Sequence, residues 1–375
     1  MFTRLAVLAT GNRQCTPGGQ RQSGGGVRGR RVACQLVLSL VLAVLAPSLV
    51  ARAADPADQA AKIEAAKKEG KVVWYVSMFD IDTAEQVGKA FEKKYPGVQV
   101  QVVRATAGVI YQRVLQESEA GVFADDVFSS TEEGHYLNFK DKKLIRPYLP
   151  VDADKVVARF QHIDKDNTYQ VASVGVILLM NNTQKVSAAD KPKNWKDLLD
   201  PKWKDKIAFG HPAFSGYIAT WVLSLNDLYG WDYFEKLAKQ NPLIGRSAND
   251  AITQLSSGER LVAAGPDATT LKAKNRGNPV DITYPEDGSV FMTAPSAIMA
   301  KAPHPHAAEL LMDFFMSKEY SELLVRNGFS PMRPDVEPPK GLRPLSEVKL
   351  IRPPAAELKT EIPKIIEKFR STFGI

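Results

Sequence analysis

The sequence predicts an α/β protein of two lobes, and three observations lead to this class. Apolar strand-like runs alternate with periodic helix-like runs over most of residues 55–335, which favours a mostly parallel sheet covered by helices. Residues 54–375 are enough for more than one hydrophobic core, and at this size two lobes are more common than one. Two long apolar runs, residues 171–180 and 289–299, are typical of strands that cross between lobes.

The first 53 residues are expected to be a cleaved signal peptide. Residues 1–31 hold six arginines and no acidic residue, and an apolar run follows over residues 36–50. Residues 51–53 fit the small-residue pattern of a cleavage site. An uncleaved membrane anchor is the alternative, but the run is shorter than the roughly 20 residues that a span needs and contains Pro47. The sequence does not decide between Sec and twin-arginine export, nor does it fix the translation start.

Removing this leader changes the charge of the chain. The leader carries seven of the 49 basic residues and none of the 42 acidic ones, which leaves 42 basic against 42 acidic residues. The mature chain is therefore formally neutral, and no nucleic acid or anionic membrane is predicted as its partner. Both cysteines, at positions 15 and 34, also lie in the leader, so we expect a monomer without disulfides, held together by its core.

Residues 55–132 predict a first alternation of strands and helices. Asp55 and Pro56 begin a helix that Gly70 ends, because an N-cap acid, a proline in the first turn and a terminal glycine are usual helix limits. Residues 72–76 are apolar on both faces, as in a buried strand. Later runs predict a helix that ends at residues 96–97, a strand over 98–103, a helix over 109–120, a strand over 126–128 and a helix opened by 129–132.

A second alternation follows the first crossing strand. Its expected elements are a segment over 195–199, a strand over 207–210, helices over 215–225, 231–239 and 249–257, a strand over 261–264 and a helix after 266–267. After the return strand come helices over 303–316, 319–325 and near 358–369. We therefore expect lobe 1 to comprise residues 54–172 and 293–330, lobe 2 to comprise 173–292, and residues 331–375 to pack on the lobes as a tail and a helix.

The corner at residues 207–225 is the first candidate binding element. The strand ends in a glycine, Pro212 prevents regular structure, and a serine stands at the N-cap of the helix behind it. The free N–H groups and the positive end of the helix dipole suit an anion. The alternative is that the serine only caps the helix and the tyrosine packs. The candidate ligand contacts in this corner are His211, Ser215, Gly216 and Tyr217.

Polar side chains also gather at other strand ends. Because ligands of open α/β sheets bind outside the carboxyl ends of the strands, these groups are expected to face one cleft. Each one alone is more often an ordinary helix cap, and the turn at residues 286–288 is equally a hairpin. The candidates are Ser77, Phe79, Ser129, Ser130, Thr131, Asp267 and Asp287.

Signals of catalysis are poor. Residues 54–375 contain no Gly-x-Ser-x-Gly elbow, His-Glu-x-x-His motif, P-loop or dinucleotide glycine fingerprint. Glu132, Glu133 and His135 have the side chains of metal ligands, but without a partner cluster a solvated helix start is the simpler interpretation. We therefore predict no enzyme activity, no cofactor and no metal site. A periplasmic hydrolase is the alternative class.

The ordered set of segments resembles the periplasmic solute-binding proteins of ABC importers. The resemblance covers nearly all of residues 71–335, and it implies two α/β lobes of the type II-like arrangement, joined by crossing strands and closing on a solute like a hinge. It also implies a periplasmic location and a membrane permease as partner. The segments that carry it are residues 71–76, 124–130, 195–203, 211–216, 257–259 and 297–305.

The resemblance does not identify the solute, because the group contains ferric-ion, phosphonate, sugar-phosphate, thiamine and polyamine binders. Ferric-ion members carry two adjacent tyrosines soon after the strand that matches residues 261–264, whereas residues 265–268 read Gly-Pro-Asp-Ala here and the chain has no Tyr-Tyr pair. Hydroxyls and helix ends suit a small phosphonate, phosphate ester or carboxylate, with Asp267, Glu286 or Asp287 free to meet an amine. A ferric ion or ferric complex is the alternative solute.

Overall fold

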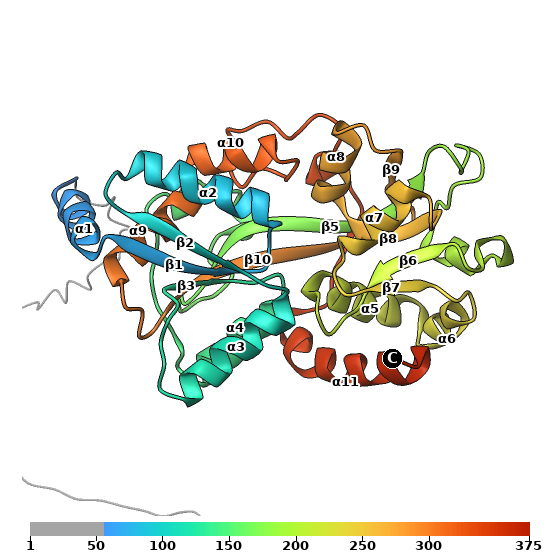
Figure 1. Ribbon diagram of the computed structural model, residues 1–375, viewed down its shortest axis with the longest axis horizontal. Coiled ribbons are helices and arrows are strands. Elements are labelled where there is room, and N and C mark those ends of the chain that lie inside the picture. The colour runs from blue at the N-terminus through green and yellow to red at the C-terminus, as the bar shows by residue number, and fades with distance from the viewer. Residues whose placement is uncertain (1–55) are drawn as a thin grey trace, which may run out of the picture. The chain divides into compact units, whose positions relative to one another are not determined.

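The computed structural model describes residues 56–375. The signal peptide predicted over residues 1–53 lies outside this described range. The described residues form an 11-stranded sheet with helices on its faces (Figure 1). Within residues 56–375, no helix combines the length and the apolar character that crossing a membrane requires.

The helices and strands that the sequence predicts occur in the predicted order. The strands are β1 (Lys71–Val76), β2 (Gln99–Arg104), β3 (Val127–Ser129), β4 (Ile145–Arg146), β5 (Gln170–Asn182), β6 (Ile207–Gly210), β7 (Leu243–Gly245), β8 (Val262–Pro266), β9 (Val280–Thr283), β10 (Ser289–Met299) and β11 (Leu350–Ile351). The helices are α1 (Pro56–Glu69), α2 (Ile81–Lys94), α3 (Ala107–Glu119), α4 (Glu133–Asp141), α5 (Gly216–Tyr229), α6 (Asp232–Ala238), α7 (Asp250–Ser257), α8 (Asp267–Asn275), α9 (Pro305–Phe315), α10 (Lys318–Arg326) and α11 (Ala355–Phe373).

The sheet is mixed, whereas the sequence predicts a mostly parallel one. Its main order is β2-β1-β3-β10-β5-β8-β6-β7. β1 pairs parallel with β2 and β3, and β6 pairs parallel with β7 and β8. Between these two parallel sets, β5 and β10 run antiparallel to each other and to their outer neighbours. The reason is that β5 carries the chain from one set to the other and β10 brings it back alongside.

Two large hydrophobic cores lie at the two parallel sets. Trp74 and Phe315 belong to the core at β1, and Trp195 and Trp221 belong to the core at β6, all four of them fully buried. β5 is buried along its whole length and supplies both cores, because successive side chains of a strand point to opposite faces. Its residues Val174, Val176 and Leu178 join the first core, and Ile177 and Leu179 join the second. The crossing strands are thus packed links between two separate cores.

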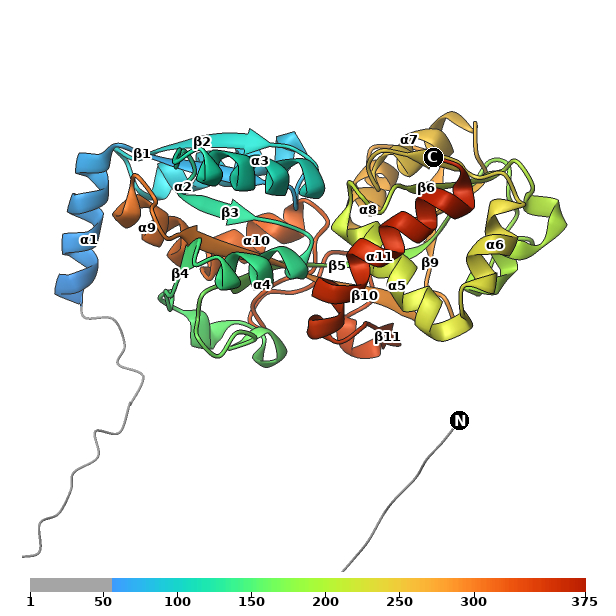
Figure 2. The same ribbon diagram turned by 90° about the horizontal axis from the view of Figure 1, so that it is seen from below.

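Helix α11 packs against helices from both parallel strand sets. Leu358, Ile362 and Phe369 join the core at β6, where α11 contacts α5 and α6 (Figure 2). The same helix also contacts α4, and the segment before it is held there by an ion pair between Arg352 and the buried Glu133. The C-terminal segment thus ends in a helix that contacts both α4 and α5.

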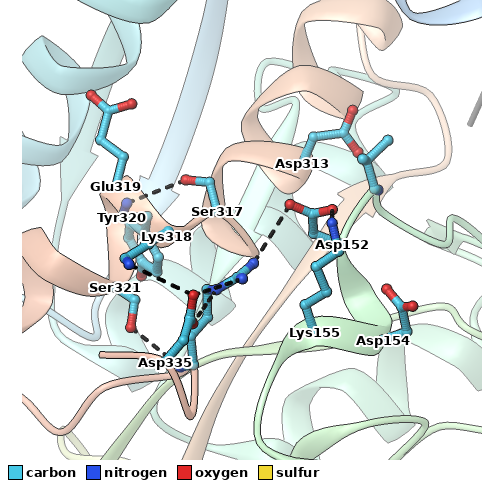
Figure 3. Close-up of polar contacts among 12 residues, drawn as sticks. Asp152, Asp154, Lys155, Asp313, Ser317, Lys318, Glu319, Tyr320, Ser321 and Asp335 are labelled. Carbon is cyan, nitrogen blue, oxygen red and sulfur yellow. Dashed lines mark hydrogen bonds and ion pairs between the residues drawn. The ribbon is translucent and has the colours of Figure 1, made fainter. Parts of the chain in front are cut away.

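Polar contacts hold the chain where it leaves α10 (Figure 3). The hydroxyl of Ser321 accepts the backbone N–H groups of residues 332 and 333, at 3.0 and 3.2 Å. Arg333 donates from Nε to Asp335 at 2.8 Å and pairs with Asp152 at 3.5 Å. The Arg333 guanidinium lowers the pKa of Asp335 through this hydrogen bond. These contacts tie the start of the C-terminal segment to the lobe that contains β1.

A buried carboxylate joins three segments of that lobe. Asp126 is fully buried and accepts the N–H of Val73 at 2.7 Å and the N–H of His304 at 2.7 Å. It also contacts Nδ1 of His304 at 2.8 Å. One side chain therefore satisfies backbone groups at the start of β1 and in the loop between β10 and α9.

We predict that Asp126→Ala lowers the free energy of unfolding by roughly 2–4 kcal/mol, because two backbone N–H groups lose their acceptor and each such loss costs about 1–3 kcal/mol. Denaturant titration of the mature protein measures this change. Asp82→Ala, at a side chain that is 58% exposed, is the control and is expected to leave stability nearly unchanged. Equal effects of the two substitutions would contradict the role given to Asp126.

Candidate functional site

A narrow cleft lies where the two parallel strand sets face each other. It is lined by the loops that follow β1, β2, β3, β6, β7 and β8, each at the carboxyl end of its strand. These loops come from both predicted lobes. The cavity volume is about 40 Å³, which leaves room for a few waters or one compact chemical group.

Six of the predicted ligand contacts line this cleft. They come from four strand ends, those of β1, β3, β6 and β8, so the strand-end argument places them together. They are Ser77, Phe79, Thr131, Ser215, Tyr217 and Asp267.

Two other candidates, Ser129 and Ser130, are fully buried and do not line the cleft. The hydroxyl of Ser129 accepts Nε1 of Trp74 at 2.7 Å and contacts the hydroxyl of Ser296 at 2.6 Å. The hydroxyl of Ser130 contacts Nδ1 of His135 at 2.9 Å. Both hydroxyls are therefore used inside the lobe, and only Thr131 of this triplet reaches the cleft.

Asp287 lies at the far end of α5 from the cleft. It accepts the backbone N–H of Trp195 at 2.8 Å and a hydrogen bond from the hydroxyl of Tyr229, the last residue of α5. A helix of this length spans roughly 20 Å, so Asp287 does not lie beside Ser215. Its turn is not a hairpin either, because it joins β9 and β10, which both pair with β5 and not with each other in the described sheet.

His211 and Gly216 also have structural contacts. Nδ1 of His211 accepts the N–H of Ala213 at 3.0 Å, and burial lowers the pKa of His211. Gly216 packs directly on the backbone of Thr131, because a Cβ atom there would lie 2.6 Å from the Thr131 carbonyl. His211 thus shapes the loop, and Gly216 permits a close approach across the cleft.

Helix N-termini converge on the cleft. The N-cap residues of α2, α3, α5 and α8 all line it, and so do residues before α7. At α5, the N–H groups of Gly216 and Tyr217 have no protein acceptor within residues 56–375. The hydroxyls of Thr106 and Tyr217 are buried and also lack a partner in the described chain. These are the groups that an anion or a hydroxylated solute would satisfy.

Arg104 is a cleft residue that the sequence analysis did not predict. Its Nε donates to the carbonyl of Phe79 at 3.2 Å, and no carboxylate of the described residues forms an ion pair with it. Burial lowers the pKa of Arg104, against the smaller opposite effects of Asp80 and Asp250. The cleft therefore contains a partly buried cation whose charge is not paired. Its position at the end of β2 is the signal that would have found it.

Asp267 brings a buried carboxylate into the same cleft. It is 3% exposed, and its Oδ1 atom accepts the N–H groups of Val176 at 3.2 Å and Ala268 at 2.8 Å. Burial raises the pKa of Asp267 to about 6, although these backbone hydrogen bonds lower it. The cleft thus presents separate positive and negative groups.

Contacts on two sides hold the cleft closed. On one side, Nζ of Lys272 reaches Asp80 at 3.0 Å and the hydroxyl of Thr83 at 3.2 Å. On the other side, the carbonyl of Ala213 lies so near Gly108 that a Cβ atom there would be 2.2 Å away. Lys272 lies in α8 and Gly108 in α3, so both contacts join segments of different parallel sets.

One group resembles a catalytic arrangement. Ser130, His135 and Glu132 form a chain of contacts, with His135 Nε2 at 3.3 Å from Glu132. A serine nucleophile must reach its substrate, whereas Ser130 is fully buried and also accepts the N–H of Glu132 at 3.2 Å.

Within the described range, no group of three or more His, Cys, Asp or Glu side chains is arranged to hold a metal ion.

The fold and the cleft define a two-lobed α/β binding protein. Residues 125–360 match the model of the bacterial extracellular solute-binding proteins, and the chain belongs to this family. The predicted fold class and the predicted resemblance to periplasmic solute-binding proteins of ABC importers are both confirmed by the family match and by the structural neighbours.

Two curated relatives span most of the chain. An uncharacterized protein of Haemophilus influenzae is 27% identical over 277 residues, which cover 71% of this chain and 78% of that protein. A protein of Salmonella typhimurium, named as a candidate 2-aminoethylphosphonate-binding periplasmic protein, is 23% identical over 288 residues, covering 72% of this chain and 77% of its own length.

Two solved structures share the fold. The periplasmic binding protein AfuA of Actinobacillus pleuropneumoniae, with exogenous fructose-6-phosphate bound, has a TM-score of 0.75 at 23% identity and covers 82% of this chain and 99% of its own. Iron-bound HitA of Pseudomonas aeruginosa has a TM-score of 0.68 at 21% identity, covering 80% of this chain and 99% of its own. These likenesses show the fold and leave the solute open.

The contact of Ser215 with its helix leads to a prediction on stability. Its hydroxyl accepts the N–H of Ile218 at 3.4 Å, whereas Ser317 caps α10 at 3.2 Å and also donates to the Phe314 carbonyl at 2.7 Å. We predict that Ser317→Ala costs about 1 kcal/mol or more of unfolding free energy and Ser215→Ala only about 0.5 kcal/mol. Thermal or denaturant unfolding of both variants measures this. An equal loss would show that Ser215 acts mainly as a structural cap.

Proposed function

We propose that the chain is the extracytoplasmic solute-binding component of an ABC importer that captures a small anionic solute between its lobes and delivers it to a membrane permease. The observation that carries the anionic part is the unpaired guanidinium of Arg104 beside free helix N–H groups. We further propose a periplasmic monomer, and lobes with the boundaries expected from the sequence: residues 54–172 with 293–330, and residues 173–292.

The electrostatics of the cleft support an anion. Removing a cation from water costs several kcal/mol unless an opposite charge replaces the water, and lobe closure removes most water around Arg104. The two free N–H groups at the start of α5 and the dipole of that helix favour the same sign of charge. An anion between Arg104 and α5 would satisfy all of these groups together.

A phosphonate or phosphate ester suits these donors better than other anions. Its three oxygen atoms can accept hydrogen bonds from several directions, and a guanidinium donates two parallel bonds to such a group. One similar protein is named as a candidate 2-aminoethylphosphonate-binding protein, and the structure of another contains exogenous fructose-6-phosphate. A carboxylate is the remaining anionic class that fits the predicted cleft.

A ferric ion is the alternative solute, because iron-bound HitA shares the fold. Among the described residues, the cleft offers oxygen atoms of Tyr217, Asp267 and Asp80 as ligands, and Asp80 is already paired with Lys272. Arg104 would repel a bare cation but would attract an anionic chelator. The iron alternative therefore favours a ferric complex over the free ion.

Arg104→Met tests the anion site. We predict that its affinity for 2-aminoethylphosphonate and for fructose-6-phosphate falls roughly ten- to a hundredfold relative to wild type, since a hydrogen bond to a charged group contributes about 1.5–3 kcal/mol. Isothermal titration of the mature protein measures the affinities. Ser215→Ala is expected to lose affinity in the same direction, with little loss of stability.

Arg326→Met is the matched control, because Arg326 is exposed on α10 outside the cleft. It is expected to bind as wild type does. If wild type binds neither compound and instead takes up ferric citrate, the iron alternative replaces this proposal. Turnover of ester or peptide substrates by the purified protein would instead favour the hydrolase alternative.

A further inference from the structure

The carboxylate of Asp267 is not used by the anion site described above. It lies at the start of α8, in a different segment from Arg104 and Ser215, and its side chain is almost completely buried in the cleft wall. A carboxylate in such a place repels an anionic solute unless another group offsets its charge.

No cation of residues 56–375 forms an ion pair with Asp267. Its hydrogen bonds from Val176 and Ala268 both reach Oδ1, and no side chain of the described residues donates to Oδ2. The titratable side chains that respond to its charge are the phenols of Tyr217 and Tyr284, both neutral near pH 7. Lys272, on the same helix, is held by Asp80 and Thr83.

The hydroxyl of Tyr217 also lacks a hydrogen-bond partner. Tyr217 lines the same cleft, and its hydroxyl is buried and has no partner in the described chain. A phenol oxygen can accept a hydrogen bond from an ammonium group, although more weakly than a carboxylate oxygen does. Asp267 and Tyr217 therefore each bring an acceptor without a side-chain donor to the cleft that also contains Arg104 and the free N–H groups of α5.

We propose that Asp267 and the hydroxyl of Tyr217 form an ammonium subsite, so that the solute is a compact zwitterion with an amine at this subsite and an oxyanion at Arg104 and α5. This inference rests on the proposed function, because it extends the same cleft.

The subsite also explains how such a buried charge is tolerated. A buried carboxylate without a counterion is costly, and the raised pKa of Asp267 reflects this cost. An ammonium group would supply the missing charge and donate to Oδ2 and to the phenol oxygen. Closure of the lobes would then bury an ion pair without net charge at each end of the solute.

Two ligands of matched shape test the proposal: 2-aminoethylphosphonate and n-propylphosphonate, in which a methyl group replaces the ammonium group. We expect wild type to bind the amine about ten- to a hundredfold more tightly than its propyl analogue. Asp267→Asn, which keeps an oxygen acceptor for the two backbone N–H groups, should lose most of this preference and still bind n-propylphosphonate. Isothermal titration gives the four affinities.

A pH series adds a measurement that a purely structural role of Asp267 would leave unchanged. The ammonium group makes the phosphonate of its ligand more acidic, so the titrations of the two phosphonates do not cancel, and Asp267→Asn serves as the reference for the ratio of the two affinities. In wild type this ratio should fall as the pH drops below about 6, where Asp267 becomes protonated. In Asp267→Asn the ratio should fall much less over the same range.

The outcomes separate the two proposals. If wild type binds both phosphonates equally, or if Asp267→Asn keeps the preference for the amine, the ammonium subsite is overturned while the anion site stands. If wild type binds neither phosphonate nor fructose-6-phosphate, the proposed function fails and the subsite fails with it. If it binds fructose-6-phosphate alone, only the subsite is overturned. Tyr217→Phe, which removes only the hydroxyl, should reduce the preference for the amine severalfold and so tests the subsite even if Asp267→Asn does not fold.

Discussion

The antiparallel pairing of β5 with β10 determines where the other elements of the protein lie. The two strands pair from Ile177 and Val290 to Gln170 and Ser296, and all of their side chains are buried. On one side of them stands the parallel set at β1, and on the other the parallel set at β6. Because both sets direct the carboxyl ends of their strands toward the same region, six loops and several helix N-termini meet in one cleft.

This arrangement gives the cleft its chemistry. Free N–H groups at α5 and the guanidinium of Arg104 come from different parallel sets, so neither set alone completes the site. The close approaches at Gly108 and Gly216 show why small residues stand there, because any side chain would meet a backbone carbonyl across the cleft. Binding and closure would therefore depend on the same surfaces.

The sequence predicted the order of the elements well because glycines, prolines and caps mark their limits plainly. It predicted Ser77, Thr131, Ser215 and Asp267 at the cleft for the same reason, since each stands just after a strand. It did not separate Ser129 and Ser130 from Thr131, because neighbouring residues at a strand end point to different sides. Arg104 also stands at the end of a strand, but the sequence alone does not show that its side chain turns into the cleft, because that direction depends on the sheet.

The sequence pattern also did not predict that the sheet is mixed. Long buried strands have the same apolar composition whether they run parallel or antiparallel, so the runs at residues 170–182 and 289–299 indicated crossings but not their relative direction. Asp287 shows a related limit. By sequence its turn is equally suited to a cleft and to a hairpin, whereas in the structure it joins two strands that both pair with β5, and Asp287 accepts from Trp195 and Tyr229.

The most direct measurement is native mass spectrometry of the mature protein purified from the periplasm of its own host, followed by release and identification of any retained compound. The proposed function and the ammonium subsite predict a small retained solute that contains both an oxyanion and an amine. A retained ferric ion, ferric complex or neutral compound would contradict the roles assigned to Arg104 and Asp267.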